Sequence, residues 1–192
     1  WPLNANWKIY VDNYQEGYHI PTAHPMLAKT IDNKNYKVTN MSEERPFSVH
    51  SVPPKEVQSQ TKATWLFMFP NWAINVYHFG MDIEIMTPLS PTSLQLEYFF
   101  YTNPQTPPEE RERCLQDLIQ TSNVLSMEDI VLVENVQRNL ASGVYQRGVL
   151  CEEMENGVHS FHQLYKAWMA RPLPSTGPHV SPSPCSTSCN EK

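Results

Sequence analysis

The sequence has few cysteines, no excess of basic residues and no long apolar run, and each shortage excludes a class of protein. Its four cysteines are too sparse for a disulfide framework, which makes a reducing cytosol the default compartment. The net charge of −6 argues against a nucleic-acid binder, which needs a basic face. No apolar stretch approaches the roughly 20 residues of a membrane span. We therefore expect a cytoplasmic protein, or an organellar one in a eukaryote, with neither nucleic acid nor a membrane as a partner.

The chain also lacks an initiator methionine and a recognisable secretory signal, because it opens with Trp1 and Pro2. This opening suggests a fragment or a processed product. The 192 residues, 40% hydrophobic and 18% charged, suffice for one globular domain with a core. The Pro/Ser-rich stretch 172–192 cannot bury a core and is predicted to be a disordered tail. The predicted domain is therefore 1–171.

The spacing of apolar residues changes twice along the chain and predicts an α+β fold. Helical spacing over 6–19 predicts a first helix, which Pro21 would end, and 25–35 reads as a connector. Aromatic and β-branched runs predict short antiparallel strands, with turns at Gly80 and at Ser90. These strands are expected at 36–41, 46–52, 63–69, 72–79, 81–86 and 93–102. A long helix over about 106–140, with Thr106 as its cap and a candidate break near Ser126, and a shorter one over about 158–170 complete the prediction.

Two histidines near the N-terminus form the most informative motif. His19 and His24 are five residues apart, and Glu16 precedes the first of them by about one helical turn. Two imidazoles and one carboxylate on one face of a metal form the ligand set of non-haem Fe(II) enzymes that activate oxygen. The spacing of two histidines also arises by chance, so the motif needs a third ligand elsewhere in the chain.

The long predicted helix supplies a candidate for this third ligand. Asp129 falls on the same stripe as the apolar residues Leu118, Leu125, Val133, Val136 and Leu140. A buried carboxylate is costly unless it is paired or coordinated, and a metal would offset that cost. Pairing with Arg138 or Arg147 is the more ordinary alternative. Glu128 faces away from the stripe and is expected to be solvated.

The motifs closely resemble the catalytic domain of Rieske-type ring-hydroxylating oxygenase α subunits. The resemblance rests on Asn6-Trp7-Lys8, Asp12-Asn13-Tyr14, Glu16-Gly17-Tyr18-His19 and Ala23-His24-Pro25. It continues in Glu128-Asp129, which is followed by Glu134 and Gln137, and it covers the chain from Asn6 to about Met169. It implies a helix-grip (START-like) fold, in which an antiparallel sheet curls around a long helix.

The resemblance also implies roles for single residues. His19, His24 and Asp129 look like the ligands of a mononuclear Fe(II), and Asn13 and Glu16 are candidates to orient the imidazoles. Glu16 resembles the acidic residue that couples this iron to a Rieske [2Fe–2S] cluster on a neighbouring subunit, and it is assigned as catalytic. A glutamate at this position is more typical of the monooxygenases of quaternary ammonium compounds, such as choline and carnitine, although other subgroups share it.

The sequence departs from the family in one respect, because the Cys-x-His and Cys-x-x-His motifs of a Rieske domain are missing. We expect the chain to be a truncated catalytic half that is not competent alone. The resemblance implies a homotrimer in the full-length protein, and O2 and a small molecule as substrates. It further implies that NAD(P)H supplies electrons through a ferredoxin or a flavin reductase.

The substrate is inferred less directly. An aromatic cage would suit a quaternary ammonium group, and Tyr14, Trp72 and Phe79 are the principal candidates for it, with Tyr18 and Tyr77 as further ones. The ordinary alternative is that these rings belong to the core. The function predicted first is O2-dependent monooxygenation of a small quaternary amine. A domain for aromatic-ring hydroxylation and a ligand-binding module without turnover are the alternatives.

Overall fold

The computed structural model describes residues 1–55, 63–77 and 80–172. The predicted Pro/Ser tail lies outside these residues except for its first position. No helix in the described ranges is long and apolar enough to cross a membrane. The predicted cytoplasmic location is not tested by this observation and stays a prediction.

The described strands form one antiparallel sheet of seven, in the order β1-β7-β6-β5-β4-β3-β2. Apart from β1, every strand pairs with its neighbour in the sequence, because the connections are short. The strands are β1 (Pro2–Leu3), β2 (Lys37–Val38), β3 (Phe47–Val52), β4 (Ala63–Met68), β5 (Trp72–Tyr77), β6 (Gly80–Ser90) and β7 (Ser93–Thr102). The antiparallel prediction is confirmed, and the sequence reading missed only β1, which is two residues long.

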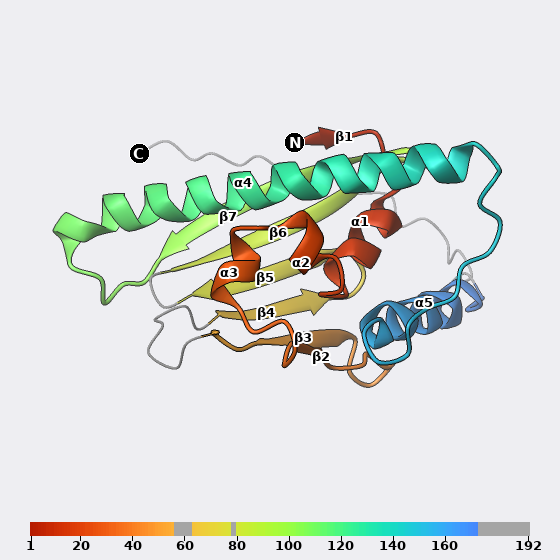
Figure 1. The fold of residues 1–192 in the computed structure, drawn as a ribbon, viewed down its shortest axis with the longest axis horizontal. Helices are drawn as coiled ribbons and strands as arrows, with labels where there is room; N and C mark the ends of the chain where they lie inside the picture. Colours follow the sequence, from red (N-terminus) through yellow and green to blue (C-terminus); the bar gives the residue numbers. More distant parts are fainter. Residues whose placement is uncertain (56–62, 78–79, 173–192) are drawn as a thin grey trace, which may run out of the picture.

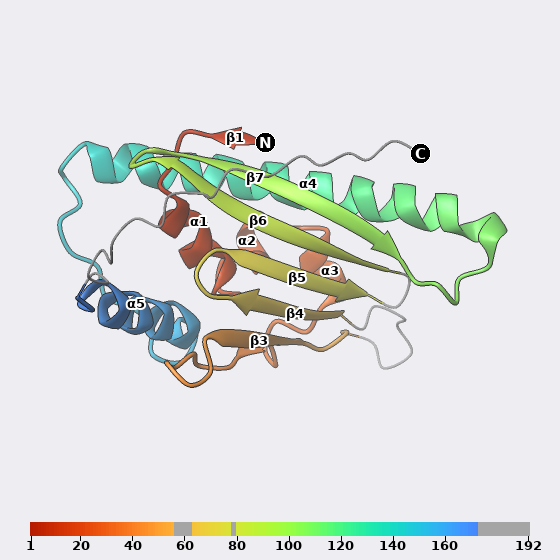
Figure 2. The same ribbon diagram turned by 180° about the vertical axis from the view of Figure 1, so that it is seen from behind.

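The helices are gathered on one face of this sheet (Figures 1 and 2). The long helix α4 (Pro108–Ala141) runs along the β7 edge, and α1 (Trp7–Tyr14), α2 (Ile20–Ala23) and α3 (Leu27–Thr30) lie across the middle strands. The last helix, α5 (Asn156–Met169), lies at one end of the sheet. This arrangement of an antiparallel sheet around a long helix is the predicted α+β helix-grip fold.

The first helix ends earlier than the spacing predicted. Helix α1 stops at Tyr14, and a turn separates it from α2, in which Pro21 occupies the first turn instead of ending regular structure. Gly17 lies in this turn, where an added Cβ would come within 2.5 Å of the Tyr36 ring. The turn redirects the chain, so His19 leaves the axis of α1 and begins a helix of its own.

The long helix agrees with the prediction in extent but differs from it in its N-cap and in which residues of the stripe are buried. Pro107 is the N-cap of α4 in place of Thr106, and the helix is unbroken at Ser126, which is buried. Leu118 and Val133 on the predicted stripe are buried, whereas Val136 and Leu140 are exposed. The buried residues of α4 therefore lie in its middle, from Leu118 to Val133, and the stripe is exposed in the last turns of the helix.

The inner face of the sheet is divided between a core and a cavity. Leu94 and Leu96 of β7, Met86 of β6 and Phe67 of β4 pack with Phe161 of α5 in the main core. Along β6 the inward positions then change to Glu84 and Asp82, which lie beneath the first two helices. The core thus anchors one end of the sheet, and the other end is left to line a polar cavity.

Candidate metal centre

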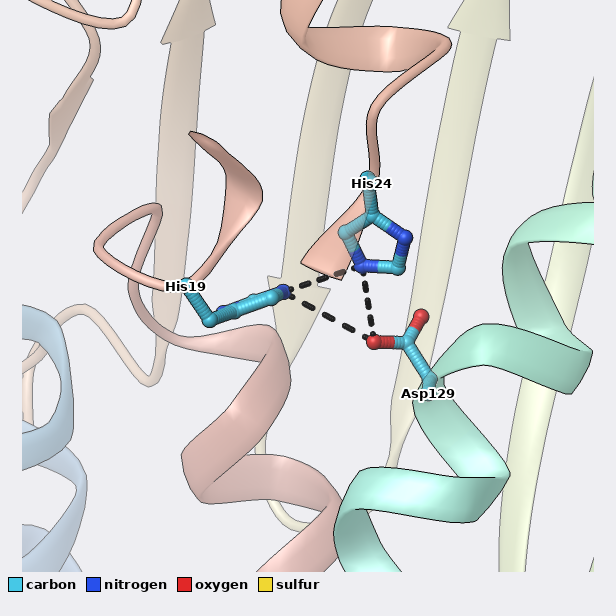
Figure 3. Close-up of side chains that lie close together, drawn as sticks. All are labelled: His19, His24 and Asp129. Carbon is cyan, nitrogen blue, oxygen red and sulfur yellow. Dashed lines mark hydrogen bonds and ion pairs between the residues drawn. The ribbon is translucent and has the colours of Figure 1, made fainter. Parts of the chain in front are cut away.

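His19, His24 and Asp129 converge on one point (Figure 3). The Nε2 atoms of the two imidazoles are 3.1 Å apart, and Asp129 Oδ1 lies 3.0 Å from His24 Nε2 and 3.6 Å from His19 Nε2. No other group of three or more His, Cys, Asp or Glu residues with metal-site geometry occurs in residues 1–55, 63–77 and 80–172. The chain thus brings together the three ligands predicted from sequence, which come from two segments more than a hundred residues apart.

The short helix α2 sets the positions of both imidazoles. His19 is its N-cap and His24 its C-cap, and backbone bonds from Ala23 N to His19 O (2.9 Å) and from His24 N to Ile20 O (3.0 Å) close its single turn. The buried side chain of Ile20 fixes this turn against Ile31 and Val52. A single helical turn placed between the two ligands therefore brings both imidazoles to the same side.

Glu16 holds His19. One Glu16 carboxylate oxygen contacts His19 Nδ1, and the other accepts hydrogen bonds from the backbone amides of Tyr18 and His19, the latter at 3.1 Å. A carboxylate beside Nδ1 favours the tautomer that carries its proton there and leaves Nε2 free to donate its lone pair. Glu16 therefore contacts the imidazole that the sequence reading proposed it would orient. Its predicted role as a bridge to a cluster is not tested.

Glu128 holds His24 in the same way. Its Oε2 lies 2.7 Å from His24 Nδ1, and His24 is buried, with 3% of its surface exposed. The sequence reading placed Glu128 away from the site in solvent, and that expectation is wrong. Glu128 does lie off the apolar stripe, but its long side chain reaches the His24 ring. The ring lies between Glu128 and Asp129. Each imidazole thus has a carboxylate at Nδ1.

Asn13, a candidate to orient an imidazole, contacts Asp129 instead. Its Nδ2 donates a 2.6 Å hydrogen bond to Asp129 Oδ1. Arg138, a predicted alternative partner of Asp129, instead contacts Asn135. The remaining alternative, Arg147, is exposed and forms no recorded ion pair among the described residues. Asp129 is therefore surrounded by Asn13 and two imidazoles, and its negative charge would be available to bind a metal ion.

The donor set fits a divalent transition metal. Two imidazole nitrogens and one carboxylate oxygen lie within 4.8 Å of one another, as three ligands on one side of a single ion would. Burial alone lowers the pKa of His24, but its hydrogen bonds to Asp129 and Glu128 raise it overall. The site therefore attracts positive charge, whether a proton or a metal ion. The residues present match the mononuclear iron that the sequence resemblance implies.

A cavity of about 90 Å³ opens beside the three ligands. Tyr14 and Tyr77 line it, as predicted, and Trp65 lines it although the sequence reading did not single it out. Trp72 alternates along β5 with the inward-facing Ala73 and Asn75, so it lies on the opposite face of the sheet. Tyr18 is exposed (61%), and Phe79 lies outside the described residues.

The floor of the cavity contains two carboxylates that the sequence reading missed. Asp82 and Glu84 are 1% and 3% exposed, and their partners are Asn75 (Nδ2 to Oδ1, 2.8 Å) and Tyr98 (hydroxyl to Oε1, 2.6 Å). Burial raises the pKa of Asp82 to about 6 and that of Glu84 to about 7. Their alternation with Ile83 and Ile85 normally predicts acids in solvent and isoleucines inside. Here the polarity is reversed, because the inner face borders a cavity.

The fold and the three converging side chains define a class of protein, a helix-grip domain with a candidate metal centre, and comparison with known proteins gives the family. A family model described as the catalytic domain of the ring-hydroxylating alpha subunit matches residues 1–171. The chain therefore belongs to this family, as its motifs suggested, and is its catalytic domain.

The chain is similar to choline and carnitine monooxygenases. Chloroplastic choline monooxygenase of Arabidopsis thaliana is 29% identical over 170 residues, covering 84% of this chain and 39% of the relative. The carnitine monooxygenase oxygenase subunit of Acinetobacter baumannii is 31% identical over 176 residues, covering 80% of this chain and 43% of the relative. A crystal structure of the quaternary ammonium Rieske monooxygenase CntA with an inhibitor matches at a TM-score of 0.73 and 25% identity, over 88% of this chain and 47% of that one. The chain spans about two fifths of the length of these curated relatives.

Proposed function

We propose that this chain is the iron-binding catalytic domain of an O2-dependent monooxygenase that hydroxylates a small quaternary amine. The observation that carries the proposal is the convergence of His19, His24 and Asp129 beside a cavity. The similarity to choline and carnitine monooxygenases supports the substrate class. A bound Fe(II) would supply the site for reducing O2 and for inserting one oxygen atom into a C–H bond.

The protein's own residues prepare this site in three ways. Glu16 and Glu128 keep the Nδ1 protons of His19 and His24 in place, so both Nε2 lone pairs face the same point. Asn13 fixes Asp129 Oδ1 between them. All three ligands lie on one side, and the cavity places a small molecule beside them without requiring it to be a ligand.

Electron supply belongs to the proposal as well. Glu16 connects His19 with the backbone of the turn that carries the exposed Tyr18, so it lies between the metal site and the surface. We assign Glu16 as the link through which a [2Fe–2S] cluster of another subunit passes electrons. The cluster would be reduced by NAD(P)H through a ferredoxin or a flavin reductase, and a homotrimer would bring it to this surface.

Hydrogen peroxide allows the chain to be tested without these electron donors. Peroxide carries both the oxygen atom and the two electrons that O2 would otherwise need, so a substrate C–H and H2O2 become C–OH and H2O. The Fe(II)-loaded chain is expected to oxidise choline or carnitine, with 18O from labelled peroxide in the product detected by mass spectrometry. Asp129→Ala should abolish this product. Absence of labelled product from the iron-loaded, folded chain with both substrates would contradict the proposal.

A further inference from the structure

The cavity beside the metal site is unusual in its charge. Asp82 and Glu84 occupy alternate positions of β6, point to the same face, and are almost completely buried. Among the described residues that line the cavity there is no lysine or arginine, and the only basic groups are the imidazoles of His19 and His24. Neither Asp82 nor Glu84 belongs to any ion pair recorded for the described chain. Two carboxylates therefore lie in the cavity wall without a cationic partner.

The hydrogen bonds around the two acids hold them in place but do not neutralise them. Asn75, directly opposite Asp82 across the β5–β6 pair, donates to Oδ1, and Tyr98, directly opposite Glu84 across the β6–β7 pair, donates to Oε1. Tyr14 in turn donates to Asn75 Oδ1 at 2.7 Å, which fixes the direction of the amide. These partners are all neutral, so each ionised carboxylate carries a desolvation cost that a bound cation would offset.

Aromatic rings complete the wall. Tyr14, Trp65 and Tyr77 line the same cavity as the two acids. The face of an aromatic ring attracts a cation, and the attraction grows when water is excluded. A group that carries a positive charge but has no N–H to donate, such as a trimethylammonium group, is suited to a wall of aromatic rings combined with carboxylates.

The charge of the cavity favours a cation over an arene. The cavity has a volume of about 90 Å³ and two buried carboxylates in its wall. An arene would have to lie against these carboxylates, which would leave them without solvation. The charge of the wall therefore points to a small cationic group.

We propose that Asp82 and Glu84 form, with Tyr14, Trp65 and Tyr77, a cation subsite that binds the quaternary ammonium group of the substrate and selects it over neutral molecules of the same shape. This inference rests on the proposed function for its substrate class. It adds the residues that determine selectivity. The subsite lies in the same cavity as the metal ligands, so a bound cation would place the rest of its molecule beside them.

A pair of ligands that differ only in charge tests the subsite. Choline and 3,3-dimethylbutan-1-ol have nearly the same shape, but carbon replaces the charged nitrogen in the second. Binding of each to the full chain, loaded with Fe(II) without oxygen, is measured by calorimetry. We expect the unmodified chain to prefer choline, and Asp82→Asn and Glu84→Gln each to weaken choline binding about tenfold while binding of the neutral alcohol changes less than twofold.

Glu97→Gln is the matched control, because Glu97 lies on the exposed face of β7 and the substitution removes the same charge. It should leave the ratio of choline to alcohol affinities unchanged. An unchanged ratio in both Asp82→Asn and Glu84→Gln, an equal loss of both ligands, or a lack of preference in the unmodified chain would each overturn the subsite.

The outcome is separable from that of the proposed function, because ligand binding and peroxide-driven oxidation are measured independently. A choline preference that depends on Asp82 and Glu84, in a chain without peroxide-driven turnover, would support the subsite and contradict the function. Turnover of choline together with an unchanged ratio in both variants would do the reverse.

Discussion

His24 Nδ1 lies 2.7 Å from Glu128 Oε2, so neighbouring residues of α4 contact both nitrogens of the same imidazole, Asp129 at Nε2 and Glu128 at Nδ1. A ligand histidine held at its second nitrogen has a fixed tautomer, a fixed ring orientation and a more basic donor atom. We therefore predict that Glu128 positions His24, a role that the apolar stripe of the helix does not reveal.

Glu128→Gln tests this positioning role. The amide can accept a hydrogen bond but carries no charge, so we expect Fe(II) or Co(II) affinity to fall about 10- to 100-fold with the fold retained. Competition with a chelating dye measures the affinity, and circular dichroism monitors the fold. Glu110→Gln, at an exposed position in the first turn of the same helix, is the control and should bind metal like the unmodified chain. Equal affinities in the two variants would remove Glu128 from the site.

Gly17→Ala tests the turn that separates the first two helices. The new methyl group would lie 2.5 Å from two atoms of the Tyr36 ring, which is held in turn by a 2.6 Å hydrogen bond between its hydroxyl and His50 Nδ1. We expect unfolding by urea to show a loss of about 1–3 kcal/mol, typical of overpacking. Tyr36→Leu removes the obstructing ring, so the cost of Gly17→Ala should be smaller in that background. A cost that is equal in both backgrounds would show that the contact is not the cause.

Glu84 predicts a pH dependence of stability. Burial raises its pKa from 4.5 to about 7, so the folded chain keeps a proton that the unfolded chain loses over this window. The stability linked to this proton is complete below pH 4.5 and is lost as the pH rises through about 7. Relative to the unmodified chain, Glu84→Gln should therefore gain stability from pH 4.5 to 8, by up to roughly 3 kcal/mol, since one pKa unit corresponds to about 1.4 kcal/mol.

Urea unfolding at several pH values in the presence of a chelator measures this gain without interference from metal. Glu97→Gln, which removes an exposed carboxylate, should run parallel to the unmodified chain. If Glu84→Gln also ran parallel, Glu84 would not titrate in this window.

The sequence predicted the parts of this molecule that depend on local patterns. The alternation of Leu94 and Leu96 with polar residues fixed the buried face of β7, and the stripe on α4 led to Asp129. The histidine spacing predicted two candidate ligands, and the family resemblance assigned their roles. For β7 and α4 the relevant period, of two or of about 3.6 residues, belongs to a single element.

The remaining parts depend on how elements meet, which a single pattern does not encode. The turn after α1 places Gly17 against the ring of Tyr36, nineteen positions away. Glu128 belongs to the site because the His24 ring lies within reach of its side chain. Asp82 and Glu84 face inward because the inner face of β6 borders a cavity at these two positions. Alternation locates the two faces of β6 but does not say which one is enclosed.

Metal binding by the three converging side chains is the most direct test of the central claim. Fe(II) is added without oxygen to the unmodified chain, His19→Ala and Asp129→Ala, and bound iron is measured after gel filtration, with circular dichroism to confirm folding. The predicted result is one iron per unmodified chain and a loss of stoichiometric iron in both variants. An unmodified, folded chain without iron, or folded variants that keep it, would contradict the assignment of His19, His24 and Asp129 as its ligands.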